Sequence, residues 1–350
     1  MKGYNEGKVT LAHGEGGLAT QRLISGLILK YFDHPALVRL DDAAVLSTEG
    51  GGEGCSLAVT TDSFVVKPLF FPGGDIGKLA VCGTVNDLAV CGARPRYLTV
   101  GLILEEGFSL EDLERILSSV ARTAAEAGVS IVAGDTKVVE KGSADQVFIN
   151  TTGVGFIPPG TALGYERIRP GDAVVINGGV GEHGLAVLSQ REGLSFATPI
   201  ESDCAPLNGL IQGVLNRFGE RIRFMRDVTR GGVATVVQEV AAASGVDFVL
   251  EEERLPTSAA VVGACEMLGL DPLYLANEGK VLMVVDPSVA GELVAALRGE
   301  RYGKEGAVIG YTAQTRGKRQ GLGGEAFLKT ALGATRRLDL LDGELLPRIC

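Results

Sequence analysis

The sequence contains 350 residues, more than the roughly 250–300 at which a single hydrophobic core usually stops growing, so we expect two domains. Hydrophobic residues make up 45% of the chain, and the formal net charge of −10 argues against a nucleic-acid-binding groove, which requires clustered lysine and arginine. The start of the chain lacks a signal-peptide pattern, and no run approaches the roughly 20 apolar residues needed to cross a bilayer. These features predict a cytoplasmic protein with neither nucleic-acid nor membrane partners.

The first half of the chain contains glycine-rich, strand-like and helical segments in turn. Residues 1–39 form a segment with a glycine-rich run, and Leu57–Val59 is predicted as a strand that Thr60–Ser63 ends. Ser109 caps an amphipathic helix that stops at Gly128. Two further strands are predicted at Ser130–Ala133 and Val147–Ile157.

Residues 159–171, rich in proline and glycine, are predicted as the boundary between the two domains. Helices and strands continue beyond this boundary, without the strict β-α-β alternation of a doubly wound sheet. We therefore predict an α+β fold, with two mixed α/β domains built on mixed or antiparallel sheets. The strands predicted in the second half are Ala173–Ile176, Lys280–Val285 and Ala307–Tyr311, and the helices are Glu182–Arg191, Val233–Ser244, Ser258–Leu268 and Val289–Arg298.

The last segment, residues 338–350, has no clear periodicity after Gly343. Pro347 stops any helix there and keeps the preceding residue extended. We expect a flexible, unpacked tail in which Arg348 can pair with an acidic wall of a cleft. The tail ends in a cysteine.

The cysteines and histidines do not form a metal site in the sequence. The six cysteines show no Cys-x-x-Cys pair or zinc spacing and lie at positions 55, 82, 91, 204, 265 and 350. Cys82 and Cys91 lie in an apolar run and are predicted as small core residues. His13, His34 and His183 stand apart, and we expect surface or loop positions for all three. Packing does not account for Cys350, so we expect it to be a working thiol that carries a substrate.

Carboxylates recur at turn-like or strand-end positions along the chain. They occur in Asp41-Asp42-Ala43-Ala44, Thr60-Thr61-Asp62-Ser63, Asn86-Asp87, Gly134-Asp135-Thr136-Lys137 and Arg226-Asp227-Val228-Thr229-Arg230-Gly231-Gly232. Each alone could be a cap or a turn. However, Asn86-Asp87 interrupts an apolar helix, and a buried unpaired carboxylate is costly. Converging carboxylates favour Mg²⁺ with phosphate oxygens, and glycine-rich turns can supply backbone N–H groups to the phosphates.

The order of these motifs resembles a known superfamily. With His13-Gly14-Glu15-Gly16-Gly17 and Asn277-Glu278-Gly279 added, the set is similar to the ATP-binding superfamily of aminoimidazole ribonucleotide synthetase, selenophosphate synthetase and thiamine-phosphate kinase. The ending Pro347-Arg348-Ile349-Cys350 narrows the resemblance to the HypE family of hydrogenase maturation factors. The likeness extends over nearly the whole chain.

The resemblance implies a domain at residues 40–158, which binds ATP and pairs across a homodimer into a barrel, and a second domain at residues 168–337. ATP would lie in a cleft between domains. The implied Mg²⁺ ligands are Asp42, Asp62, Asp87, Asp135 and Asp227. The implied nucleotide-binding residues are Gly14, Gly16, Gly17, Asn86, Thr136, Thr229, Gly231 and Gly232, with the first three in a mobile loop over the phosphates.

The resemblance also implies a reaction. A HypF-like maturation factor would place a carbamoyl group on Cys350, and the chain would use ATP to dehydrate the S-carboxamide to a thiocyanate. The cyanide would pass through an iron-carrying HypC-HypD-like complex to a [NiFe]-hydrogenase. Glu278 is the first candidate for the base, and Lys137 would neutralise the developing oxyanion or relay protons.

Other interpretations remain open. A thiamine-phosphate kinase-like enzyme would share the motifs but has no use for a terminal cysteine, and a selenophosphate synthetase would want a reactive residue well before Cys55. A non-catalytic nucleotide-binding adaptor would use the tail only as a docking peptide. Lys137 and Glu278 could form a surface salt bridge, and Cys350 could be a chance terminal residue.

Overall fold

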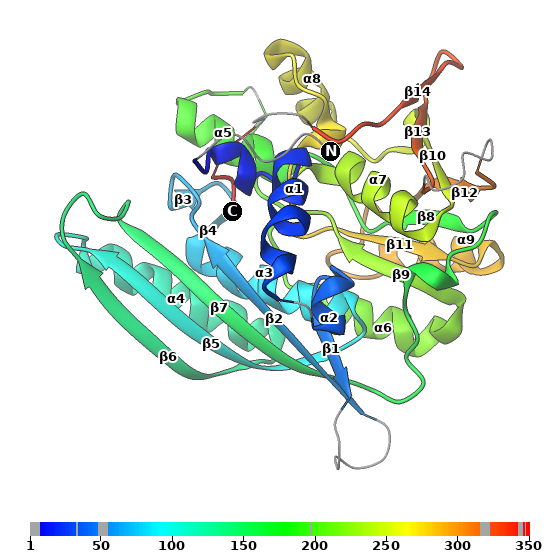
Figure 1. Ribbon diagram of the computed structural model, residues 1–350. Coiled ribbons are helices and arrows are strands. Elements are labelled where there is room, and N and C mark those ends of the chain that lie inside the picture. Colours follow the sequence, from blue (N-terminus) through cyan, green and yellow to red (C-terminus); the bar gives the residue numbers. More distant parts are fainter. Residues whose placement is uncertain are drawn as a thin grey trace.

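The computed structural model describes residues 8–32, 34–47, 55–196, 198–315, 323–341, 346 and 348–350. Two β-sheets, one in each half of the described chain, are each covered by helices (Figure 1). The short N-terminal helices α1 (Leu18–Gly26) and α2 (Pro35–Val38) precede the first sheet. No helix within these ranges is both long and apolar enough to cross a membrane.

The first sheet has five strands in the order β1-β2-β7-β5-β6. Its strands are β1 (Ala44–Ser47), β2 (Ser56–Phe64), β5 (Arg94–Glu105), β6 (Ser130–Val139) and β7 (Val147–Ile157). Only β5 and β6 pair in parallel among these neighbours. Helices α3 (Ile76–Val90) and α4 (Leu110–Ala127) lie against one face, and a small hairpin is formed by β3 (Phe70–Phe71) and β4 (Gly74–Asp75).

Several predictions for this half are confirmed, and two strand ends are wrong. The Ser109 hydroxyl accepts from the Asp112 amide at 3.3 Å, and α4 ends at Gly128 with φ 68°. The strand Val147–Ile157 has the predicted bounds. In contrast, β2 and β6 continue through Thr60–Ser63 and Gly134–Lys137, which were expected to end them. Both segments keep their ladder partners, because the main-chain pairing continues whether a polar side chain is exposed, as in Gly134–Lys137, or hydrogen-bonded, as at Thr60.

The second sheet has seven strands in the order β14-β13-β10-β12-β8-β11-β9. The strands are β8 (Ala173–Ile176), β9 (Ile222–Asp227), β10 (Asp247–Glu251), β11 (Val281–Val285), β12 (Ala307–Ala313), β13 (Ala326–Lys329) and β14 (Thr335–Arg337). The helices are α5 (Glu182–Glu192), α6 (Asn208–Phe218), α7 (Gly232–Ser244), α8 (Ala259–Leu268) and α9 (Ala290–Arg298). Helix α7 packs in one apolar cluster, and α6 and α9 in another, so the sheet has a core on each face.

The predicted α+β class with mixed sheets is confirmed, since β10 and β13 are parallel and the other described neighbours in the second sheet are antiparallel. The elements predicted in this half are present within two residues of their expected bounds. Helix α6 and strands β9, β10, β13 and β14 had not been predicted.

Candidate functional site

Four of the motif carboxylates meet where the two halves of the chain join. Asp42 precedes β1, Asp62 lies in β2, Asp87 lies in α3 and Asp227 ends β9. Burial raises the pKa of Asp87 and Asp227 well above the usual carboxyl range, and repulsion from other members of the group adds to the rise. We call these four residues the carboxylate cluster.

A local hydrogen bond and two arginines, Arg226 beside Asp42 and Arg230 near Asp62 and Asp227, offset part of this repulsion. The Thr60 hydroxyl donates to Asp87 Oδ2 at 2.9 Å. Arg226 lies with Nε 3.2 Å from Asp42 Oδ1 and with Nη2 3.2 Å from Glu239 Oε2. Burial raises the pKa of Asp42 to about 6 although Arg226 opposes the shift. The cluster therefore keeps an excess of carboxylates over cations.

This excess suits a divalent cation, because Mg²⁺ binds carboxylate oxygens together with phosphate oxygens and water. Across the described ranges, however, no group of three or more histidine, cysteine, aspartate or glutamate side chains is placed to hold a metal ion. The carboxylate chemistry of Asp42, Asp62, Asp87 and Asp227 fits Mg²⁺, and a metal ion here would need further ligands such as phosphate oxygens.

Asp135, Thr136 and Lys137 lie apart from the cluster on β6, the outer strand of the first sheet (Figure 1). Lys137 Nζ is 2.7 Å from Asp135 Oδ2, and the two side chains are 67% and 70% exposed. In the register of the sheet, Asp135 is level with Ser63 of β2, with β5 and β7 between them. Three interstrand spacings correspond to roughly 14 Å. Within one chain, Asp135 and Lys137 therefore do not join the cluster.

The N-terminal glycines lie beside Arg230 and the C-terminal segment. Arg230 Nη1 donates to the Gly14 carbonyl at 2.6 Å, and a Cβ on Gly16, which has φ +81°, would lie 3.5 Å from Arg230 Cβ. A Cβ on Gly17 would lie 2.6 Å from the Leu341 carbonyl oxygen. The glycine run is therefore part of the region around the tail.

Gly231 and Gly232 allow α7 to start immediately after the motif that contains Asp227. They have φ of 76° and 62°, and a Cβ on Gly232 would clash with the carbonyl oxygens of Leu273 and Leu275. The Gly232 amide donates to the Thr229 carbonyl at 3.0 Å, which closes the turn. The positive end of the α7 dipole is thereby placed next to the turn that follows the cluster.

The side chain of Asn86 connects the two halves of the chain. Its Nδ2 donates to the Ala205 carbonyl at 3.0 Å, and its Oδ1 accepts from the Leu207 amide at 2.8 Å. A weaker bond of 3.4 Å runs from Nδ2 to the Glu278 carbonyl. In this structure Asn86 thus fixes the main chain just before α6 and, more weakly, the main chain of Glu278.

Glu278 is buried, with 3% exposure, and its Oε1 has no hydrogen-bond partner. Burial raises its pKa well above the usual range, and Cys204 and nearby carboxylates add to the rise. Its main chain is nevertheless fixed, since Asp203 accepts from the Glu278 amide at 3.0 Å and from the Gly279 amide at 3.1 Å. Lys280 Nζ lies 2.9 Å from Asp203 Oδ2 and balances its charge. The result is an unpaired carboxyl on a rigid support.

The expectation of an unpacked tail is wrong for residues 348–350. One oxygen of the terminal carboxylate of Cys350 accepts from the Val65 amide at 3.0 Å, and Ile349 is 4% exposed in an apolar cluster to which both halves contribute. Figure 1 shows the C-terminus beside the end of β2. The predicted pairing of Arg348 with an acidic group is confirmed, with Nη1 2.5 Å from Asp145 Oδ2. Tertiary contacts thus order a segment that has no periodicity of its own.

The docked Cys350 thiol lies near the carboxylate cluster and Glu278. Burial raises its pKa to about 12, Arg230 opposes this shift, and Glu278 and Asp62 add to it. The Cys350 thiol is also the main cause of the raised pKa of Arg230. Arg230 is a site residue to which the sequence assigned no role, although its motif was recognised.

The expectation of a surface or loop position for His183 is also wrong. His183 lies in α5 with no exposed surface. Its Nε2 is 2.9 Å from the Ile349 carbonyl and its Nδ1 is 2.8 Å from Ser202 Oγ. A carbonyl only accepts, so Nε2 carries a proton, and burial lowers the pKa of the ring, which favours the neutral form. The partner that buries His183 is the distant chain end, which no local pattern indicates.

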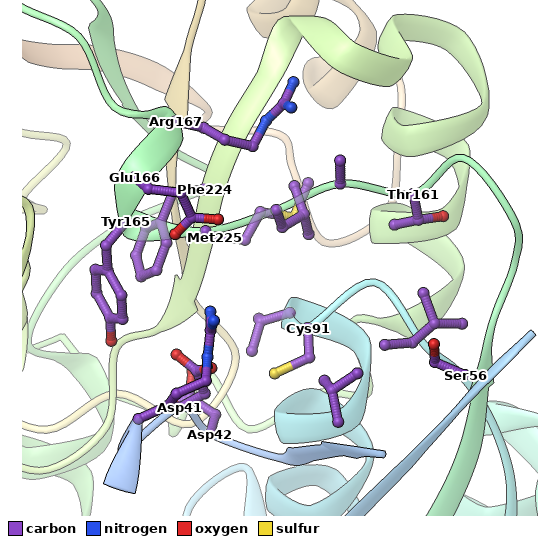
Figure 2. A pocket seen from close by; sticks show the side chains of 17 residues that line it. Asp41, Asp42, Ser56, Cys91, Thr161, Tyr165, Glu166, Arg167, Phe224 and Met225 are labelled. Atoms are coloured by element: carbon purple, nitrogen blue, oxygen red, sulfur yellow. The ribbon is translucent and has the colours of Figure 1, made fainter. Parts of the chain in front are cut away.

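A cavity of about 530 Å³ opens on the Asp42 side of the cluster (Figure 2). Asp41 and Asp42 lie on its wall, opposite Tyr165 and Phe224 from the second half. Asp41 pairs with Arg39 at 2.7 Å, whereas Asp42 faces Arg226. The two adjacent carboxylates therefore have different partners.

Comparisons with known proteins give a consistent result. Residues 40–157 match the family described as AIR synthase related protein, N-terminal domain, and residues 169–321 match AIR synthase related protein, C-terminal domain. The carbamoyl dehydratase HypE of Rhizobium leguminosarum bv. viciae is 48% identical over 346 residues, which cover 98% of this chain and 95% of that protein.

Two solved structures are similar over most of their length. The hydrogenase maturation protein HypE in complex with ATP is 47% identical, with a TM-score of 0.80, and the match covers 98% of this chain and 100% of that chain. A chain of a HypE-HypF complex is 48% identical, with a TM-score of 0.84, and the match covers 91% of this chain and 99% of that chain.

Proposed function

This chain belongs to the HypE family, and we propose that it uses ATP to dehydrate an S-carboxamide on Cys350 to a thiocyanate that supplies cyanide for a [NiFe]-hydrogenase. The observation that carries the proposal is the docked position of Cys350, where Arg230, Glu278 and Asp62 are all near enough to influence the pKa of the buried thiol. A relative's structure holds ATP, which supports ATP as the phosphoryl donor here.

The reaction proposed at the tail is balanced in two steps. The carboxamide oxygen attacks the γ-phosphorus of ATP, ADP leaves, and loss of one N–H proton gives an imidate phosphate. Loss of phosphate together with the second N–H proton then forms the C≡N bond. Glu278 is suited to receive these protons, because a carboxylate with a raised pKa is a stronger base once it is ionised.

The carboxylate cluster and two glycine-rich turns are the groups that we propose around the phosphates of ATP. Asp42, Asp62, Asp87 and Asp227 would hold Mg²⁺, which when bound neutralises phosphate charge. The glycine run containing Gly14, Gly16 and Gly17, together with the turn at Thr229, Gly231 and Gly232, would supply N–H groups to the phosphates. Residues 40–158 would form the nucleotide-binding and dimerisation domain, and residues 168–337 the second domain.

Asp135, Thr136 and Lys137 would act from a second copy of the chain. In support, β6 is an exposed outer strand, and the sheet carries exposed apolar side chains such as Ile103, Ile131 and Val138. A homodimer that pairs these sheets would cover that surface and bring Lys137 to the partner's site. Mixing inactive Lys137→Ala and Glu278→Gln dimers should then restore activity as subunits exchange. Restoration would be absent if both residues act within one chain.

The partners follow from the family. A HypE-HypF complex supports a HypF-like carbamoyl donor for this chain, and we propose a HypC-HypD-like iron-carrying complex as the acceptor of cyanide, in the cytoplasm. Carbamoylation and cyanide transfer by these partners require residues 348–350 to leave the buried position that they occupy in this structure.

The deciding experiment is mass spectrometry of the C-terminal peptide after incubation with a carbamoyl donor system, ATP and Mg²⁺. The carbamoylated peptide should lose the mass of one water only when ATP is present. A carbamoyl adduct that never loses water would overturn the proposal. ATP-dependent phosphorylation of a free small molecule by the Cys350→Ala variant would instead favour a kinase of the thiamine-phosphate kinase type. Nucleotide binding without turnover would favour a non-catalytic adaptor.

A further inference from the structure

The side chain of Arg348 is held more firmly than that of a residue in a loose tail. Its Nε donates to the Val65 carbonyl at 2.8 Å, and its Nη1 lies 2.5 Å from Asp145 Oδ2. Arg348 has φ 54°, a left-handed conformation that residues other than glycine rarely adopt. Such a conformation persists only where surrounding contacts determine it.

The main chain of the tail is held by α5 of the second half. His183 donates to the Ile349 carbonyl at 2.9 Å, and Arg191 Nη2 donates to the Arg348 carbonyl at 2.7 Å. His183 and Arg191 are about two helical turns apart, so they project from one face of α5. Arg191 Nε also donates to the Lys67 carbonyl at 2.8 Å, which connects α5 to the first half.

The first half holds the same residues from the other side. The Val65 amide donates to an oxygen of the Cys350 terminal carboxylate at 3.0 Å, and the Lys67 amide donates to the Arg348 carbonyl at 3.2 Å. This alternate spacing is that of a peptide added to the end of a strand, here to the residues that follow β2. Main-chain bonds of this kind give affinity but do not distinguish one sequence or register from another.

We propose that Asp145, His183 and Arg191 form a tail-reading site that selects a chain end of the form Arg-x-Cys and sets its register. Asp145 recognises the arginine, and the two α5 side chains hold the main-chain carbonyls of Arg348 and Ile349. A slip by one residue would remove Arg348 from Asp145 and displace the thiol from Glu278. This inference rests on the proposed function, and it assigns the determinant of substrate position within it.

Asp145 is well placed for this role because it lies in the connection between β6 and β7, outside the carboxylate cluster. Its pKa is lowered chiefly by hydrogen bonds from Lys67 and Arg348, so it is charged at neutral pH. It is therefore a positioning residue, which would act on the rate only through Arg348. Its replacement leaves every residue near the Cys350 thiol unchanged.

The first test is the single-turnover rate of water loss from the carbamoylated tail, measured by mass spectrometry. Asp145→Asn should lower this rate roughly five- to tenfold, since charge-assisted hydrogen bonds are the stronger ones. Glu292→Gln, which breaks an exposed 2.5 Å pair with Arg217, is the control for removal of a carboxylate. An unchanged rate in Asp145→Asn would overturn the proposal.

The second test does not depend on turnover. Alkylation of Cys350 by iodoacetamide should be slow in the wild-type protein and several-fold faster in Asp145→Asn, with the exposed Cys55 as an internal reference. Equal Cys350 alkylation rates in the two proteins would contradict a reading site. If the wild-type tail never loses water, the proposed function fails, while the alkylation rates still decide whether the tail is read.

Discussion

The carboxylate cluster and the Asp135–Lys137 segment contain the same kinds of residues in opposite environments. Asp42, Asp87 and their neighbours are enclosed where the two halves of the chain meet, and their pKa values are raised. Asp135 is exposed on β6, and its hydrogen bond with Lys137 lowers its pKa. One group stores electrostatic repulsion that a cation can relieve, whereas the other is already neutralised. A motif thus becomes a site only when other parts of the fold enclose it.

The largest expected effect concerns the enclosed region. Glu278→Gln keeps the shape of a buried side chain but removes its capacity to accept a proton. We expect the rate of water loss from the carbamoylated tail to fall about 10²- to 10⁴-fold, the usual contribution of a general base. ATP binding, measured by calorimetry, should change little. A rate within threefold of wild type would exclude Glu278 as the base.

A smaller effect is expected where residues 348–350 pack against α5, beside the carboxylate cluster. His183→Ala removes a fully buried ring and leaves the Ile349 carbonyl without its donor. We expect a loss of about 2–4 kcal/mol in the free energy of unfolding, because a cavity and an unsatisfied polar group are both created. Urea denaturation measures this loss. His183→Gln retains an N–H donor and should lose less; an equal loss would show that the hydrogen bond is unimportant.

Replacing a cluster carboxylate should stabilise the metal-free protein. Asp87 has a folded-state pKa above its unfolded value, so its stabilising contribution is present below about pH 4 and is lost as the pH rises through the folded pKa. Asp87→Asn should therefore unfold at a higher temperature than wild type at pH 7.5, because the variant carries no charge that burial disfavours.

Thermal denaturation at several pH values checks this. The advantage of Asp87→Asn should shrink toward pH 4.5, and Mg²⁺ with ATP should stabilise wild type more than the variant. A variant that is less stable than wild type at pH 7.5 without metal would show that the carboxylates do not strain the cluster.

The smallest effect is expected on β6. Asp135→Asn removes an exposed ion pair, and exposed pairs contribute little to stability. We expect no measurable change in the thermal denaturation of a protein kept dilute enough to be monomeric. A clear change there would show that Asp135 has an intrachain partner and would remove the contrast between the two regions.

Local patterns in the sequence predicted the elements that depend on local physics. Helix α4 was found with its cap because its apolar spacing, Ser109 and Gly128 all lie within one segment. Strand ends were wrongly predicted at Thr60–Ser63 and Gly134–Lys137, since a run of polar residues within a strand resembles a turn. The resemblance supplied the site residues as a set, but only the fold separates Asp135 from Asp62.

Contacts between distant segments account for the other differences. His183 is buried by the chain end, 166 residues away in the sequence, and Arg348 is ordered by Asp145. Asn86, whose predicted role at the nucleotide stays a prediction, ties α3 to the backbone before α6. None of these partners has a periodicity or spacing that a single sequence reveals.

Among the described residues, the hydrogen bonds of residues 348–350 involve their main chain or the side chain of Arg348, and none involves the Cys350 sulfur. The dock therefore grips a bare thiol, a carboxamide and a thiocyanate with the same contacts. Only the few groups around the sulfur, such as Arg230 and Glu278, can then distinguish the finished product from its precursors. In the proposed cycle, the contacts of the main chain stay constant, and the chemical group on the sulfur alone determines when the chain end dissociates.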